Sequence, residues 1–221
     1  MIFINAIKEN KNFITLLKAF SRVQAEFKNW NIHVIGKVEK RTPYQIELFK
    51  FIEENNLVTR VIWEGIKDDV FNEYATSHIH VLASLSEGCP TCILEAMSLG
   101  LPSIGFDDCP GTNELIKHNA NGLLAKSDDR VAGLEVSLRR LMDSPSLCEY
   151  LGKQALLDSV NFDPQHTYNN WEQLFYDAAT YKTNPDRLFQ EQYSIDPEKA
   201  MHAKRMIKKL MQNYKVITNV K

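Results

Sequence analysis

The chain has 221 residues, of which 44% are hydrophobic and 24% are charged, an ordinary composition for a soluble globular protein. No apolar run approaches the roughly 20 residues that a membrane span needs, and the first residues lack the basic flank and length of a signal peptide. We therefore interpret the four cysteines as reduced thiols of a cytoplasmic protein.

Charged residues are distributed unevenly along the chain, although the net charge is only −2. From Asp196 onward there are seven basic and two acidic residues, whereas the preceding residues include 19 basic and 26 acidic ones. A mildly acidic body argues against general nucleic-acid binding. We therefore expect no nucleic acid among the partners.

Apolar runs alternate with amphipathic segments, which predicts an α/β fold with a doubly wound parallel sheet of about six strands and helices on both faces. The expected strands are residues 1–5, 30–36, 61–63, 79–83, 101–105 and 121–124. The expected helices are residues 13–27, 43–55, 71–75, 90–99, 131–142, 145–159 and 162–180, with a further one after the loop at 107–114.

Helical spacing and capping residues add detail to these elements. The first helix is expected to begin at Asn10 or Asn12, and the helix at 71–75 to begin at Asp68. Residues expected to face the core are Phe13, Leu16, Leu17 and Phe20 in the first helix, and Ile46, Phe49 and Ile52 in the second.

Three histidines lie in or beside predicted strands, and we interpret all three as structural. His33 lies one residue inside a strand, where a packed or hydrogen-bonded side chain is expected. His78 and His80 lie at the amino end of a strand, whereas α/β sheets bind ligands at the carboxyl ends of their strands.

The stretch from residue 84 to residue 97 follows a buried strand and leads into a helix, the arrangement with which α/β proteins bind anions. If Pro90 is the first helical residue, the N-cap is Cys89, which caps poorly. The amides of Thr91 and Cys92 then remain for a ligand, unless a side chain of the preceding loop folds back onto them.

Two carboxylates flank this helix start. Glu95 lies one turn into the helix and leans towards its N-terminus, while Glu87 approaches from the loop. A pocket for phosphate between two carboxylates suits a nucleotide sugar, which combines an anionic part with several hydroxyls. Gly111 and Thr112 place further bare amides at another helix start, with plain capping as the alternative.

Cys89 and Cys92 form a C-x-x-C pair, which also occurs in redox and zinc sites. The sequence has no second pair and no histidine at ligand spacing. We therefore interpret these cysteines as loop and helix packing residues and expect no metal site.

The pattern EG-x-P-x-x-x-LEAM, running from Glu87 through Glu95, with G-x-P shortly after it, resembles the signature of retaining GT-B glycosyltransferases. The similarity is greatest to glycosyltransferase family 4, or group 1. It covers residues 1–180, which would correspond to the C-terminal, Rossmann-like, donor-binding domain of that fold. A basic C-terminal extension, residues 181–221, would follow as linker and amphipathic helix.

The resemblance implies roles for individual residues in sugar transfer to an acceptor hydroxyl. Lys11 would grip the diphosphate of the donor, assisted by the backbone from Gly88 through Cys89, Pro90 and Thr91 to Cys92. Glu87 would hold hydroxyls of the transferred sugar and Glu95 the ribose. Ile66 and Lys67 would lie beside the nucleobase, and Gly111 and Thr112 would support the site. No metal or other cofactor is implied beyond the nucleotide-diphosphate-sugar.

One departure from the family pattern concerns a second cation. An arginine usually stands five residues before the position of Lys11, where this chain has Ala6, and Lys8 is a substitute. Lys8 and Lys11 also fit a solvated turn. Because of this departure, a second interpretation is a non-catalytic module that binds sugar nucleotides or a partner. A third interpretation is a GT-B sugar-nucleotide epimerase, although its usual catalytic acids and histidines are not recognisable.

The strand at Met1 opens the chain, although the first strand of a parallel sheet is normally an interior element. We interpret Met1 as a domain boundary, before which the resemblance implies an N-terminal acceptor domain. The isolated chain is then expected to bind donor without transferring sugar.

The basic helix expected at residues 197–214 has two interpretations. It lies on an anionic membrane surface, or it docks on its own domain or a neighbour. The first would place the protein in the cytoplasm, peripheral on the inner face of the membrane. By resemblance, the setting is polysaccharide or glycolipid synthesis.

Overall fold

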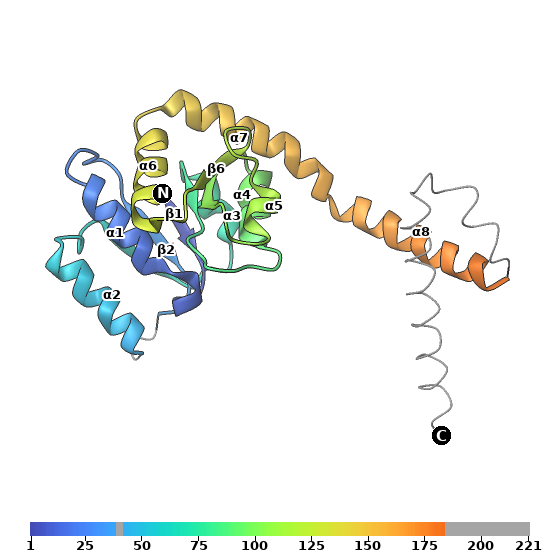
Figure 1. Cartoon of the computed structure of the whole chain (residues 1–221), viewed down its shortest axis with the longest axis horizontal. Helices are drawn as coiled ribbons and strands as arrows, with labels where there is room; N and C mark the ends of the chain where they lie inside the picture. Colours follow the sequence, from blue (N-terminus) through green and yellow to red (C-terminus); the bar gives the residue numbers. More distant parts are fainter. Residues whose placement is uncertain (39–41, 184–221) are drawn as a thin grey trace, which may run out of the picture. The chain divides into compact units, whose positions relative to one another are not determined.

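A six-stranded sheet forms the centre of residues 1–163 in the computed structural model, which describes residues 1–38 and 42–183 (Figure 1). The strands are β1 (Ile2–Ile4), β2 (Ile32–Ile35), β3 (Val61–Gly65), β4 (His80–Val81), β5 (Ser103–Phe106) and β6 (Gly122–Ala125). Every pair is parallel, in the order β3-β2-β1-β4-β5-β6. The predicted doubly wound sheet is confirmed.

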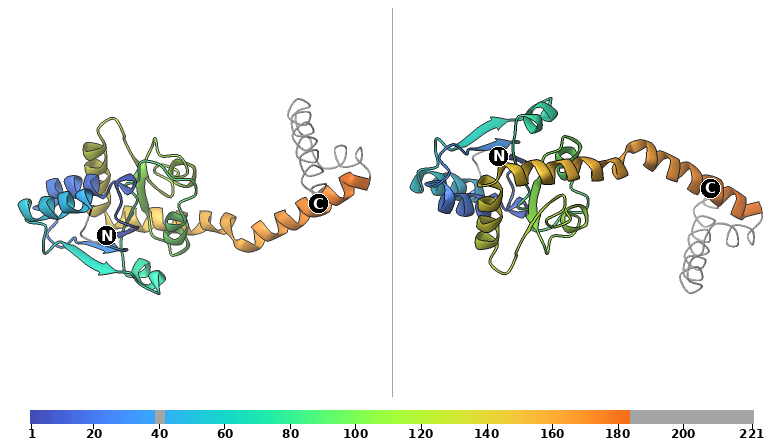
Figure 2. Two further views of the ribbon diagram at one scale, coloured as in Figure 1. Left: turned by 90° about the horizontal axis from the view of Figure 1, so that it is seen from below. Right: turned by 90° about the horizontal axis from the view of Figure 1, so that it is seen from above.

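Helices cover both faces of this sheet, and Figure 2 views them from below and from above. One face carries α1 (Phe13–Val23), α2 (Pro43–Glu54) and α6 (Arg130–Met142). The other carries α3 (Val70–Ala75), α4 (Thr91–Ser98), α5 (Thr112–Leu115) and α7 (Pro145–Ser159). The 3₁₀ turns η1 (Glu9–Lys11) and η2 (Val160–Phe162) precede α1 and follow α7.

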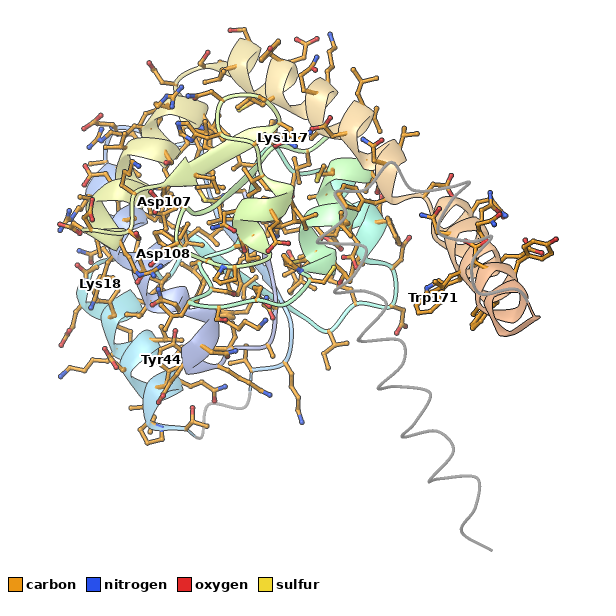
Figure 3. All side chains as sticks on the ribbon, turned by 45° about the vertical axis from the view of Figure 1, so that its right-hand side comes forward. Lys18, Tyr44, Asp107, Asp108, Lys117 and Trp171 are labelled. Atoms are coloured by element: carbon orange, nitrogen blue, oxygen red, sulfur yellow. The ribbon has the colours of Figure 1, made fainter. Side chains whose placement is uncertain are left out.

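The main core lies between the strands and the layer formed by α1, α2 and α6. All four residues predicted for the buried face of α1 are fully buried, and Phe13 packs on Phe3 of β1 with ring centroids 4.6 Å apart. Figure 3 shows Tyr44 of α2 beside α1, where its hydroxyl accepts a hydrogen bond from the amide of Ile14 at 3.2 Å. Burial of aromatic and aliphatic side chains is the dominant stabilisation of this layer.

Several expected details are wrong by one or a few residues. Ile46 is 58% exposed, because α2 buries Tyr44, Gln45 and Leu48 together with the predicted Ile52. The N-cap of α3 is Asp69 rather than Asp68. Helix α1 ends at Val23, short of the expected residue 27.

Helix α8 (Pro164–Thr183) belongs to the second compact unit and confirms the helix expected at residues 162–180. On this helix, the ring of Trp171, labelled in Figure 3, stacks on the ring of Phe175 one turn later, with centroids 5.8 Å apart. Among the described residues, no helix combines the length and hydropathy that crossing a bilayer requires. The helix expected at 197–214 lies outside those residues.

Candidate functional site

The candidate site lies where the strand order reverses direction. Strand β1 pairs with both β2 and β4, so chain connections diverge on either side of it. In open α/β sheets, ligands bind at the carboxyl ends of the strands beside such a switch point. The loops after β1 and β4 meet there, because the amide of Leu85 donates to the carbonyl of Asn10 at 2.9 Å.

An ion pair joins these two loops. The ammonium nitrogen of Lys11 lies 2.6 Å from Oε1 of Glu87, and the two side chains are only 19% and 13% exposed. Lys11 ends the turn η1, and Asn12 then adopts a left-handed conformation with φ of 51°, which asparagine tolerates better than most residues. Two predicted site residues that lie 76 positions apart are thus in direct contact.

The start of α4 is open. Pro90 occupies the N-cap position rather than the first helical position, so the helix begins one residue later than expected. No side chain caps it, and the amides of Thr91 and Cys92 have no partner among the described residues. Gly88, Cys89 and Thr91 are exposed. Bare amides at the positive end of a helix dipole favour an anion.

Three charged side chains surround this helix start. Burial raises the pKa of the Cys92 thiol to about 12, and the carboxylates of Glu87 and Glu95 add to this rise. The ammonium of Lys11 opposes it. The two carboxylates and the cation therefore act on one point in the first turn of α4. The thiol stays protonated at neutral pH, which makes Cys92 a packing residue rather than a nucleophile.

Glu95 is held by a residue outside the motif in which it lies. The hydroxyl of Tyr74, on α3, donates to Oε2 of Glu95 at 3.0 Å and also lies 3.1 Å from the carbonyl oxygen of Cys92. Tyr74 is 1% exposed. Because it is 21 residues from Glu95, no local pattern in the sequence could have revealed the contact.

The loop after β5 packs against the loop that carries Glu87. Gly111 has φ of 73°, and a Cβ there would lie 2.6 Å from the carbonyl oxygen of Gly88 and 2.9 Å from that of Glu87. Only glycine fits so close an approach. The hydroxyl of Thr112 lies 3.3 Å from the sulfur of Cys109, within its own loop.

Ile66 and Lys67 follow β3, two strands away from β1. Ile66 is 71% exposed. The ammonium of Lys67 lies 3.1 Å from Glu64 and 3.2 Å from Glu73, so its side chain bridges β3 and α3. The predicted site residues are therefore not all in one contact network, since no contact joins this pair to Lys11 or Glu87 among the described residues.

The histidines have structural surroundings. His80 is fully buried with Nδ1 2.9 Å from the hydroxyl of Ser103, and burial lowers its pKa to about 3. His78 packs edge-on against Trp30 at 5.6 Å. Nδ1 of His33 lies 3.1 Å from Glu64. None of the three contacts the start of α4 in the described part of the chain.

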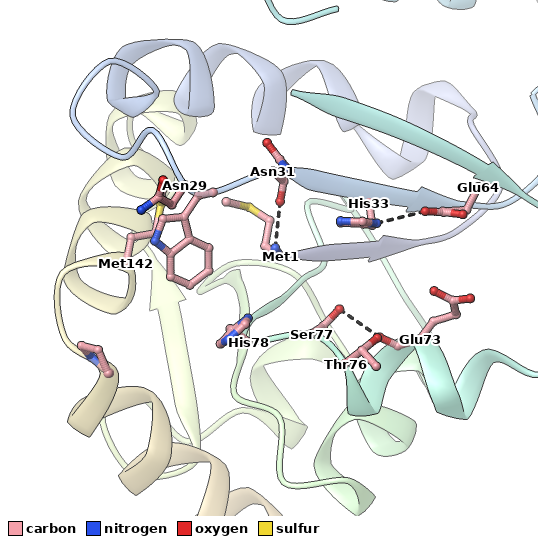
Figure 4. Close-up of a pocket in the computed structure, with 12 residues that line it drawn as sticks. Met1, Asn29, Asn31, His33, Glu64, Glu73, Thr76, Ser77, His78 and Met142 are labelled. Atoms are coloured by element: carbon pink, nitrogen blue, oxygen red, sulfur yellow. Dashed lines mark hydrogen bonds and ion pairs between the residues drawn. The ribbon is translucent and has the colours of Figure 1, made fainter. Parts of the chain in front are cut away.

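A separate cavity of about 600 Å³ lies beneath β1 and β2, beside α3 (Figure 4). His33, Glu64 and Glu73 line it, and the first two pair with each other. Its charged groups thus have protein partners, unlike the amides at the start of α4. Among the described residues, no three histidine, cysteine, aspartate or glutamate side chains are grouped so that they could hold a metal ion.

The family described as glycosyl transferases group 1 matches residues 1–157. An uncharacterized glycosyltransferase of Haemophilus influenzae is 27% identical over 165 residues, or 73% of this chain and 44% of that protein. The GalNAc-alpha-(1->4)-GalNAc-alpha-(1->3)-diNAcBac-PP-undecaprenol alpha-1,4-N-acetyl-D-galactosaminyltransferase of Campylobacter jejuni is 25% identical over 175 residues, or 79% of this chain and 47% of that protein. The chain spans less than half the length of these two relatives.

Solved structures share the fold. The pneumococcal O-GlcNAc transferase GtfA, in complex with UDP and GlcNAc, has a TM-score of 0.70 at 21% identity, over 78% of this chain and 34% of that one. Anabaena Alr3699/HepE, in complex with UDP, has a TM-score of 0.67 at 19% identity, over 77% and 48%. The C-terminal domain of the group 1 protein LpcC from Francisella tularensis has a TM-score of 0.64 at 22% identity, over 73% and 84%.

Proposed function

Because the chain belongs to the glycosyl transferases of group 1, the family that its EG-x-P motif predicted, we propose that it is the donor-binding part of a retaining glycosyltransferase. It binds a nucleotide-diphosphate-sugar, whose sugar passes to an acceptor hydroxyl in polysaccharide or glycolipid synthesis. The observation that carries the proposal is the uncapped start of α4, with the ion pair of Lys11 and Glu87 beside it and Glu95 one turn further on.

The diphosphate of the donor binds the amides of Thr91 and Cys92 and the ammonium of Lys11. Lys11 has three N–H donors, so it can keep its bond to Glu87 and still donate to a phosphate oxygen. Negative charge develops on the diphosphate as the bond to the anomeric carbon breaks. A fixed ammonium and the helix dipole stabilise that charge in the transition state more than in the bound donor.

The two carboxylates bind hydroxyl groups on either side of the diphosphate. Glu87 accepts hydrogen bonds from the transferred sugar, and Glu95 accepts them from the ribose. Hydrogen bonds to a charged acceptor are stronger than those between neutral groups. Gly111 supports this arrangement by packing against the backbone of the loop that presents Glu87.

GtfA and Alr3699/HepE were solved with UDP, which makes UDP-sugars the first donors to test. Isothermal titration calorimetry with UDP- and GDP-sugars is the direct experiment. We expect micromolar dissociation constants for one donor class, and at least a tenfold loss in Lys11→Ala and in Glu95→Ala. Exposed Lys18→Ala, on α1, is the matched control and should bind normally. Absence of binding to any sugar nucleotide contradicts the proposal.

A second candidate is a module that binds sugar nucleotides without turnover, which Ala6 in place of the usual arginine favours. The two candidates differ in whether this chain, once joined to an acceptor domain, transfers sugar. We propose that this polypeptide alone binds donor and transfers nothing, and that adding an acceptor domain restores transfer. Transfer by this polypeptide alone contradicts the need for such a domain, and an assembled protein that binds donor without turnover supports the module.

A further inference from the structure

Tyr74 is a buried hydroxyl aimed at a carboxylate of the proposed site. It lies on α3, next to α4 (Figure 1), and its hydroxyl oxygen is 3.0 Å from Oε2 of Glu95. The carbonyl oxygen of Cys92, at 3.1 Å, is a second acceptor for the same hydroxyl. A phenol has only one proton, and an ionised carboxylate accepts it more strongly than a backbone carbonyl does.

The hydroxyl remains a donor throughout the working pH range. Burial raises the pKa of Tyr74, and the neighbouring carboxylate of Glu95 raises it further. The phenol therefore does not ionise, and it cannot serve as a base. Its chemistry at this place is limited to holding one oxygen of Glu95.

The ring that carries this hydroxyl is fixed from the other side. Tyr74 packs edge-on against His80 of β4, with ring centroids 5.7 Å apart. His80 is itself fully buried and lies 2.9 Å from the hydroxyl of Ser103 on β5. Contacts thus run from the sheet through His80 and Tyr74 to Glu95, so the position of the carboxylate is set by the core.

The second oxygen of this carboxylate is left for a ligand. Oε2 of Glu95 accepts from Tyr74, whereas Oε1 has no partner among the described residues. Glu95 is only half-buried, and it lies on α4 one turn after the open start of that helix. A carboxylate with one oxygen fixed and the other open can accept hydrogen bonds from a hydroxyl pair in a defined direction.

We propose that Tyr74 is a positioning residue that orients Glu95 towards the vicinal hydroxyls of a nucleotide ribose, and so makes the site selective for ribonucleotides. This inference rests on the proposed function. A site built to bind a hydroxyl discriminates strongly against the analogue that lacks it. If the orientation is lost, Glu95 still carries its charge but accepts less well from the ribose.

The test compares two ligands rather than one. Dissociation constants are measured by calorimetry for UDP or GDP, whichever binds more tightly, and for its 2′,3′-dideoxy analogue. The dissociation constant of the dideoxy analogue divided by that of the nucleotide reports only on the ribose hydroxyls. Tyr74→Phe should lower that ratio about tenfold, the size expected for a hydrogen bond to a charged group, while the dideoxy analogue binds as before.

Four further variants separate positioning from general damage. Tyr44→Phe removes another buried hydroxyl that bonds to backbone, and should leave the ratio unchanged. Glu95→Ala should abolish the preference, and adding Tyr74→Phe to it should change nothing more, because Tyr74 acts through Glu95. Tyr74→Met, also without a hydroxyl, should repeat the result and replaces Tyr74→Phe if that variant does not fold.

Three outcomes overturn the inference. An unchanged ratio in Tyr74→Phe, or an equal loss for both ligands, shows that Tyr74 is only a packing residue. A further loss when Tyr74→Phe is added to Glu95→Ala shows that it acts independently of the carboxylate. A wild-type chain that binds neither nucleotide contradicts the proposed function itself, and with it this inference.

Discussion

The starts of α3 and α4 lie in neighbouring helices on one face of the sheet, and they are built in opposite ways. At the start of α3, Asp69 accepts hydrogen bonds from the amides of Phe71 and Asn72 at 3.0 and 3.4 Å. At the start of α4, Pro90 holds the N-cap position and has no side-chain acceptor for the amides of Thr91 and Cys92. Helices α2, α6 and α7 resemble α3, since each has a side-chain cap: Thr42, Asp129 and Ser144.

The contrast between the two helix starts shows where this chain leaves backbone amides without a partner. A missing N-cap typically costs a helix about 1 kcal/mol. The open start of α4 follows β4, directly beside the switch point, and has the pair of Lys11 and Glu87 next to it. The missing cap thus lowers the stability of α4, and an anion bound to its first amides would restore it. Four sets of variants test this contrast, beginning with the largest expected effect.

Gly111→Ala should displace the loop that precedes α4. Strain from its φ of 73° combines with overlap, because the added Cβ would lie 2.6 Å from the carbonyl oxygen of Gly88. We expect about 3 kcal/mol of lost stability in urea unfolding, together with loss of nucleotide binding. Gly65→Ala is the matched control, because Gly65 has φ of 74° with nothing within 4 Å of the added carbon. Equal losses in both variants would show that the approach to Gly88 is unimportant.

Removing one member of the ion pair should leave the other charge partly buried. Lys11→Met and Glu87→Gln are each expected to lower the free energy of unfolding by about 2 kcal/mol, since the pair is mostly shielded from water. The double variant should regain most of that stability while nucleotide binding stays lost. Recovery of binding in the double variant would remove Lys11 from the proposed site, whereas additive losses of stability would show that the two side chains do not interact.

His80 tests the contacts that hold α3 beside α4, through its packing on Tyr74. Its pKa is lowered by burial to about 3, so the folded state keeps it neutral. The free energy of unfolding should be highest above the unfolded pKa of about 6.5. It should fall as the pH is lowered, because only the unfolded state takes up a proton, and the loss should reach about 2 kcal/mol at pH 5. Unfolding free energies of wild type and His80→Asn between pH 7 and pH 5 measure this, because other titrating groups cancel in the difference. Parallel curves would show that His80 titrates normally.

Moving the cap from one helix start to the other gives the smallest effect. Asp69→Ala should cost about 1 kcal/mol of stability, measured by urea unfolding, and leave nucleotide affinity within twofold. Pro90→Ser offers α4 the cap that it lacks, so stability should change by less than about 1 kcal/mol. Nucleotide affinity should nevertheless fall severalfold, since the serine competes for the same amides. Unchanged affinity in Pro90→Ser would mean that no anion binds at the start of α4.

Much of the fold was predictable because its signals are local. Apolar spacing identified the buried face of α1, and the alternation of apolar and amphipathic segments identified all six strands. The errors are local as well. Ile46 has the hydropathy of a core residue but points away, since the neighbouring strands decide which face of α2 is covered. Asp68 and Asp69 are equally good caps by type, and the path of the chain after β3 selects the second.

The residues of the candidate site also fall into those that the sequence predicted and those that it did not. Its helix start and two glutamates lie within one short motif, so spacing alone placed them together. Tyr74, by contrast, reaches Glu95 from another helix, and nothing in its own neighbourhood distinguishes it from a core tyrosine. The contact of Gly111 with the loop of Glu87 is likewise invisible in the sequence, although a glycine near a helix start is compatible with it.

The sequence was enough to predict the order of strands and helices, the parallel sheet and the motif at the start of α4, because each follows from the residue pattern along successive segments. The contact of Lys11 with Glu87, the hydrogen bond from Tyr74 to Glu95 and the need for glycine at position 111 became known from the folded chain alone. These contacts join segments that the sheet brings to one edge, and side chains there are selected by the space and partners that other strands and helices provide.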